Sequence, residues 1–76
     1  MNRNEIAMPD GLAAVAAGRD HINTREFAYA LGKSAGQILK LHHFDGAAYG
    51  VRPLKIGRDL LWPVTEVAKL LNGGGK

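Results

Sequence analysis

Three polar side chains of types that bind nucleic acids recur at three-residue intervals near the middle of the chain: Gln37, Lys40 and His43. In a helix they lie opposite the apolar residues. A glutamine amide can form two hydrogen bonds with an adenine edge, and a lysine can reach a guanine edge or a phosphate. His43, and less surely His42, would donate to bases or phosphates, better once protonated. Two alternatives stay open: Gln37 only caps its own helix, and Lys40 is an ordinary solvated lysine.

Small and basic residues surround the start of the same predicted helix. Ser34, Ala35 and Gly36 occupy its first turn, where their size lets the helix end approach a phosphate that its free amides favour. Ordinary N-terminal helix chemistry is the alternative explanation of these three residues. Arg25 and Lys33 flank this region and are candidate phosphate clamps.

Two further cations belong to a predicted β-hairpin. Arg58 lies at the tip of its turn, a position that suits insertion into a narrow minor groove. Lys55 lies on the preceding strand, and Arg52 near the base of the hairpin is a weaker candidate. The alternative for Arg58 is a simple ion pair with the adjacent Asp59.

Catalytic and metal sites are not expected. Adjacent His42 and His43 would point about 100° apart on a helix, which does not suit a shared metal ion. No nucleophile has a base and an orienting group at a recognisable spacing. Gly46, Gly50 and Gly57 match no phosphate-cradling loop. We therefore expect a protein that is not an enzyme and binds no cofactor and no metal.

The chain has 76 residues and a formal net charge of +3, with ten lysines and arginines against seven acidic residues. This length allows one domain with a thin core. The basic balance fits a polyanionic partner, although an ordinary basic protein has the same charge. The absence of cysteine and of a long apolar run indicates a cytoplasmic protein with no membrane span.

Two short capped helices are predicted in the centre of the chain. Asn23 and Glu26 form a capping-box pattern, and Gly32 ends the first helix. Ser34 and Gln37 repeat the pattern at the start of a second helix, residues 35–44. Two short helices joined by a tight glycine-containing turn are typical of a helix-turn-helix. The residues expected to face inward are Ile22, Phe27, Ala28, Ala30 and Leu31, then Ile38 and Leu41, with Phe44 or Asp45 a turn later.

The hairpin is predicted from residues 51–56 and 60–62, which flank the turn at residues 57–59. Pro53 limits the first strand to an edge or a strand start. Because two strands alone are marginal in water, Ile56, Leu60 and Trp62 are expected to pack on the helices.

A third helix is expected after Pro63, with Thr65 as its cap and residues 72–75 as its end. Its apolar stripe consists of Val67, Leu70 and Leu71.

Residues 1–20 are interpreted as an N-terminal arm, residues 21–72 as the domain and residues 73–76 as a flexible tail. Residues 12–17 have the composition of one or two helical turns, with Asp10 as the cap and Gly18 as the stop. So short a helix is marginal alone, so we expect it only if Leu12 and Val15 dock on the domain or on a second copy.

The order helix, turn, helix, hairpin, helix resembles the excisionase-like and AlpA-like group of small MerR-type winged helix-turn-helix proteins. The resemblance covers residues 22–71 and depends on the segments at residues 23–28, 31–34, 37–38, 52–58 and 62–67. It implies a mainly α fold with a small β-hairpin, a second helix in the major groove and a hairpin wing on the minor groove or backbone. Similar proteins occur on phages, plasmids and integrated elements, where they are transcription regulators or recombination directionality factors.

The chain departs from that pattern in its second helix. The family usually has threonine at the place of Gln37, two basic residues where this chain has Leu39 and Lys40, and tryptophan at the place of Leu41. The helix is therefore less basic than the pattern, and Leu39 is expected to be exposed and available to a protein.

Two functions follow as hypotheses. The first is sequence-specific binding of double-stranded DNA, as a small transcription regulator or an excisionase-like architectural factor. Tight binding would then need a second copy or a recombinase, and loss of residues 1–18 should weaken assembly while leaving the fold intact. The alternative is a protein-interaction module that has kept the fold and lost DNA binding.

Overall fold

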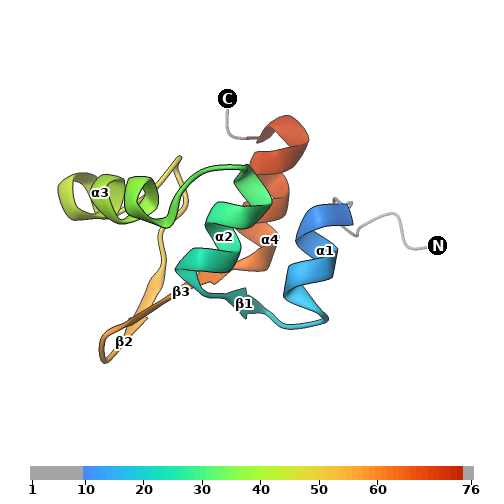
Figure 1. Cartoon of the computed structure of the whole chain (residues 1–76), viewed down its shortest axis with the longest axis horizontal. Helices are drawn as coiled ribbons and strands as arrows, with labels where there is room; N and C mark the ends of the chain where they lie inside the picture. Colours follow the sequence, from blue (N-terminus) through green and yellow to red (C-terminus); the bar gives the residue numbers. More distant parts are fainter. Residues whose placement is uncertain (1–9, 75–76) are drawn as a thin grey trace.

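The computed structural model describes residues 10–74, which form four α-helices and a three-stranded antiparallel sheet (Figure 1). Residues 1–9 of the expected arm and residues 75–76 of the expected tail lie outside the described part. The elements are α1 (Asp10–Ala16), β1 (His21–Ile22), α2 (Thr24–Leu31), α3 (Ala35–Asp45), β2 (Leu54–Ile56), β3 (Asp59–Pro63) and α4 (Val64–Lys69), which continues into a wider helical turn (Leu70–Gly74).

The helix α2 begins and ends as its sequence predicts. The Asn23 side chain accepts a hydrogen bond from the Glu26 backbone N–H at 2.8 Å, and Glu26 Oε1 accepts one from the Asn23 N–H at 2.9 Å. This reciprocal pair satisfies two amides that the first turn leaves without helical partners. Gly32 ends the helix in the left-handed region, with φ 71°. The predicted capping box and glycine stop are confirmed.

The helix α3 confirms a second capping box between Ser34 and Gln37, and its last residue is Asp45, one residue later than predicted, followed by Gly46 as the C-terminal cap. Its inward side is shorter than expected. Ile38 is fully buried, but Phe44 is 72% exposed and Asp45 is exposed, so neither continues the inward face. The C-terminal turn of α3 extends beyond the helices that cover its start (Figure 1), and the Phe44 side chain therefore does not reach the core.

The sheet has the strand order β1-β3-β2, so the predicted hairpin forms its β2–β3 half. The strand β1, which the sequence pattern did not predict, pairs Ile22 with Trp62. Pleating puts Leu60 and Trp62 on the face toward the helices and leaves Ile56, paired with Asp59, on the other face. The expectation that Ile56 packs on the helices is therefore wrong, since its side chain is 57% exposed.

Trp62 lies at the centre of the core, as its sequence context predicts. It is fully buried, and its ring centroid lies 4.6 Å from that of Phe27. Its indole Nε1 donates to the Thr24 hydroxyl at 2.9 Å, so its polar group is satisfied. The other fully buried large side chains are Leu12, Ile22, Ile38 and Val67.

The helix α4 follows β3 without a loop. Pro63 occupies the cap position and makes no side-chain cap bond, while Thr65 lies inside the first turn. The expected capping role of Thr65 is therefore wrong. The start of the helix is held instead by the Val64 N–H, which donates to the Asp20 carbonyl at 2.8 Å. Its last turn reaches Gly73, whose φ of 87° agrees with the predicted glycine end.

The helix α1 packs against α2 and α4. Its docking confirms the condition under which the sequence predicted it, with Leu12 fully buried and Val15 partly buried. Asp10 is its first residue rather than the residue before it, and Gly18, with φ 81°, follows its end. Leu12 and Ala16 belong to the core, so we expect loss of residues 1–18 to destabilise the fold, in contrast to the expectation from the sequence that the fold would stay intact.

Candidate functional site

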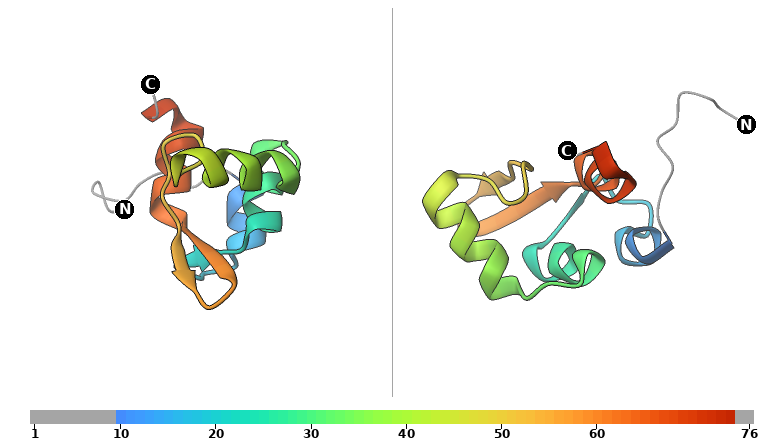
Figure 2. Two further views of the ribbon diagram at one scale, coloured as in Figure 1. Left: turned by 90° about the vertical axis from the view of Figure 1, so that its left-hand side faces the viewer. Right: turned by 90° about the horizontal axis from the view of Figure 1, so that it is seen from above.

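The helix α3 and the β2–β3 hairpin lie at one end of the molecule, and α1 lies at the other (Figure 1). Seen from that end, α3 runs across the view and the hairpin extends below it (Figure 2, left). A groove of about 470 Å³ separates them, with Leu39 of α3 on one side, Arg58 and Leu60 of the hairpin on the other, and His21 and Thr24 at its inner end. We consider this end, α3 with the hairpin and the groove, as the candidate site.

The exposed side of α3 carries the polar residues that the sequence analysis selected. Gly36, Gln37, Lys40 and His43 are all exposed. In the described part of the chain no ion pair involves Lys40, so its ammonium group is open to a ligand. The structure thus brings these four residues together on one surface, as the helical period predicts.

Two exposed apolar residues share this surface. Leu39 is 48% exposed, as expected, and lines the groove. Phe44 follows Lys40 by one helical turn and contacts the edge of the His43 ring at a centroid distance of 5.1 Å. The sequence pattern predicted that Phe44 or Asp45 faces inward, and only the length of α3 relative to its neighbours shows that Phe44 does not.

The Gln37 side chain forms its half of the capping box. Its Oε1 accepts a hydrogen bond from the Ser34 backbone N–H at 3.2 Å, and the Ser34 Oγ accepts one from the Gln37 N–H at 3.1 Å. The capping alternative for Gln37 is therefore realised, while its Nε2 donates to no group among residues 10–74. Ser34 is exposed, and Ala35 is half-buried against the core.

The hairpin presents two cations. Arg58 is exposed in the turn that joins β2 to β3, and Lys55 is exposed on β2 in register with Leu60. Within the described residues Arg58 forms no ion pair with Asp59, which was the alternative for its role. Both charges are therefore available to a partner at this end of the molecule.

Lys33 and Arg25 lie in different places. Lys33 is exposed in the turn between α2 and α3, where its N–H closes the end of α2 by donating to the Ala28 carbonyl at 2.9 Å. Arg25 lies with Val15 and Tyr29 along the contact between α1 and α2. The structure thus keeps Lys33 next to the candidate site and separates Arg25 from it.

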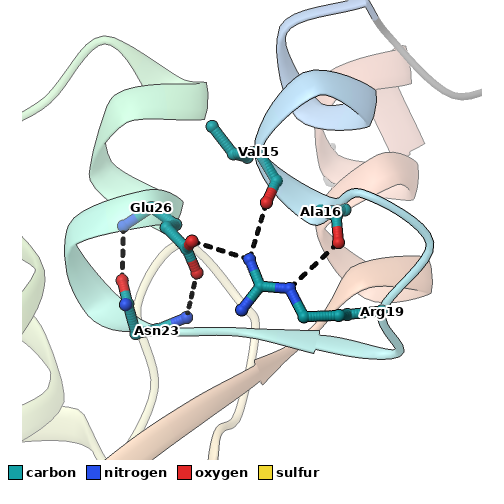
Figure 3. A network of polar contacts seen from close by, with 5 residues as sticks. All are labelled: Val15, Ala16, Arg19, Asn23 and Glu26. Carbon is teal, nitrogen blue, oxygen red and sulfur yellow. Dashed lines mark hydrogen bonds and ion pairs between the residues drawn. The ribbon is translucent and has the colours of Figure 1, made fainter.

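Arg19 forms a polar network that the sequence analysis missed (Figure 3). Its guanidinium donates to the carbonyls of Val15 and Ala16 at 2.6 and 3.0 Å and to Glu26 Oε2 at 2.6 Å. The hydrogen bond from Arg19 to the Glu26 carboxylate and, to a smaller extent, the one from the Asn23 backbone N–H lower the pKa of Glu26 below its ordinary value of 4.5. An arginine just after a predicted helix end is the signal that identifies such a carbonyl-binding role.

His21 lines the groove together with Arg19, and neither residue was selected from the sequence. It is half-buried on β1 and faces the groove from its inner end. His21 reaches the groove because β1 pairs with β3, and the two-residue sequence of β1 does not predict this pairing.

The described residues contain no group of three histidine, cysteine or acidic side chains that could hold a metal ion. Among the same residues no helix combines the length and apolar composition that crossing a bilayer requires. Comparisons of the chain with models of protein families, with curated proteins and with solved structures find no match. The geometry of the chain itself therefore carries the functional argument.

Proposed function

We propose that this protein binds double-stranded DNA as a small winged helix-turn-helix module. In this proposal α3 enters the major groove, the β2–β3 hairpin contacts the adjacent minor groove or backbone, and the groove between them receives the intervening strand. The observation that supports it is the placement of four cations that are exposed and form no ion pair within residues 10–74. Lys40 lies on α3, Lys55 and Arg58 lie on the hairpin, and Lys33 lies in the turn that precedes α3.

Four cations set the scale of the expected salt dependence. If they neutralise about four phosphates, the affinity should fall roughly 100-fold between 50 and 200 mM salt. One module of this size buries only about 600–1,000 Å² on DNA, so tight binding would require a second copy or a recombinase. Such a protein would act in the cytoplasm as a transcription regulator or as an excisionase-like architectural factor.

The test is a titration of ¹⁵N-labelled protein with a mixed-sequence duplex, at low and then at higher salt. We expect amide shifts confined to residues 33–43 and 55–59 that fade as salt is added. Unchanged spectra at high DNA concentration would contradict the proposal.

A second candidate function is a protein-interaction module. It is favoured by the exposed apolar side chains at the same end, which are Leu39, Phe44, Leu54 and Ile56. An apolar interface would lose far less affinity with added salt than the DNA complex, so the same titration against a candidate partner distinguishes the two functions.

A further inference from the structure

The two polar atoms of the Gln37 side chain are in different situations. The amide oxygen accepts from the Ser34 backbone N–H at 3.2 Å, and the Ser34 Oγ lies 3.5 Å from the same oxygen. This oxygen must face Ser34, because only an acceptor can satisfy a backbone N–H. The amide nitrogen has two hydrogens and donates to no group within residues 10–74. The Ser34 N–H and the Ser34 hydroxyl both donate to the oxygen and occupy its two lone pairs, so Gln37 presents donors alone to a ligand.

The major-groove edges of adenine and guanine present different hydrogen-bond donors and acceptors to a glutamine amide. Adenine offers one acceptor, N7, and one donor, the N6 amino group, so a glutamine that binds both of its groups must use its oxygen. Guanine offers two acceptors, N7 and O6. A glutamine whose oxygen is held by its own helix matches guanine and leaves the adenine amino group unpaired.

We propose that the capping box of α3 makes Gln37 a donor-only contact that selects guanine over adenine at one position of the DNA site. This inference rests on the proposed function and assigns a specificity to one of its residues. It reverses the adenine contact expected from the residue type alone, because it takes into account the hydrogen bond to Ser34.

The chain provides a matched variant. In α2 the equivalent position is Glu26, whose Oε1 accepts from the Asn23 N–H in the same geometry. Gln37→Glu should therefore keep the capping box of α3 and replace the free amide group by an oxygen. Gln37→Ala removes both the box and the contact, and circular dichroism of both variants establishes that α3 still forms.

The experiment starts from duplexes selected by the wild-type chain out of a randomised pool. Each selected guanine is replaced in turn by adenine, by 7-deazaguanine and by inosine. We expect one position where adenine lowers the wild-type affinity by roughly tenfold and 7-deazaguanine lowers it several-fold. Inosine keeps N7 and O6 and should leave the affinity unchanged. Gln37→Ala and Gln37→Glu should lose the discrimination at that position.

Two results would overturn the inference while leaving the proposed function standing. One is a position dependent on Gln37 at which adenine is preferred, since this requires the amide oxygen. The other is a Gln37→Ala variant that binds DNA with all base preferences unchanged. If the wild-type chain binds no duplex at low salt, the proposed function itself fails.

Discussion

The buried indole of Trp62 donates a hydrogen bond to the hydroxyl of Thr24, 38 residues earlier in the chain. Thr24 is the first residue of α2, and Trp62 lies in β3, the second strand of the hairpin. The bond therefore joins the helix pair to the hairpin at the inner end of the groove. Within residues 10–74 it is the one side-chain hydrogen bond that connects these two parts of the candidate site.

Replacing Thr24 by valine keeps the shape of the side chain and removes the acceptor. The Trp62 N–H would then remain buried without a partner, which costs about 1–3 kcal/mol. We expect urea denaturation of Thr24→Val to show this loss in the free energy of unfolding. Thr24→Ser keeps the hydroxyl and should lose clearly less. Equal losses in the two variants would show that packing of the methyl group, and not the hydrogen bond, matters here.

The pair formed by Arg19 and Glu26 predicts a loss of stability in acid. The hydrogen bond from Arg19 lowers the pKa of Glu26 in the folded chain below its value in the unfolded chain. The contribution is therefore complete above the unfolded pKa of 4.5 and is lost as the pH falls through the lower pKa of the folded chain. We expect the melting temperature of the wild type to decrease over that window, and Glu26→Gln to remove part of the decrease.

Glutamine is suitable here because Gln37 already fills the same place in the second capping box. Glu66→Gln is the control, since its pair with Lys69 is half exposed at 3.5 Å and such pairs contribute little. A pH profile of Glu26→Gln identical to that of the wild type would contradict the assignment.

The helix α1 is predicted to be essential for stability. Leu12→Ala removes a fully buried side chain at the contact of α1 with α2 and α4, and we expect a loss of about 2–5 kcal/mol in the free energy of unfolding. Ala14→Ser, on the exposed side of the same helix, should cost only about 0.5 kcal/mol. If Leu12→Ala unfolds at the same urea concentration as the wild type, α1 is not part of the cooperative core.

The features that the sequence predicted correctly are local ones. The two capping boxes depend on residues three positions apart, and the stop at Gly32 depends on a single residue with positive φ. The exposed face of α3 follows from the helical period alone. Such features involve no partner outside their own segment, so their residue types are sufficient evidence.

The features that it missed depend on contacts between distant segments. The strand β1 exists through its pairing with β3, and the same pairing starts α4 without the cap expected at Thr65. The exposure of Ile56 depends on which face of the hairpin meets the helices. Arg25 has the same charge as Lys33, and only the docking of α1 shows that it lies apart from the candidate site.

The proposed DNA complex predicts that single cations set the slope of affinity against salt. Lys40→Gln and Arg58→Gln should each lower the slope of log affinity against log salt by about 0.9, if each removes one phosphate contact. Lys69→Gln is the control, because Lys69 is paired with Glu66 on α4. Binding measured by fluorescence anisotropy at four salt concentrations gives the slopes. Equal slopes for all three variants and the wild type would exclude these cations from the interface.

We predict that Phe44 adds an apolar contact to the proposed DNA complex. It is 72% exposed on the face of α3 that carries Gln37 and Lys40, where an aromatic ring can contact a thymine methyl group. Phe44→Ala should change the free energy of unfolding by at most about 0.5 kcal/mol, as for other exposed positions, but weaken DNA binding. Tyr29→Ala is a matched control, since Tyr29 is 70% exposed on α2 beside α1. Because both rings are equally exposed, a loss of affinity in Phe44→Ala alone would assign the effect to α3. An equal effect of the two variants would mean that DNA does not distinguish the two ends of the molecule.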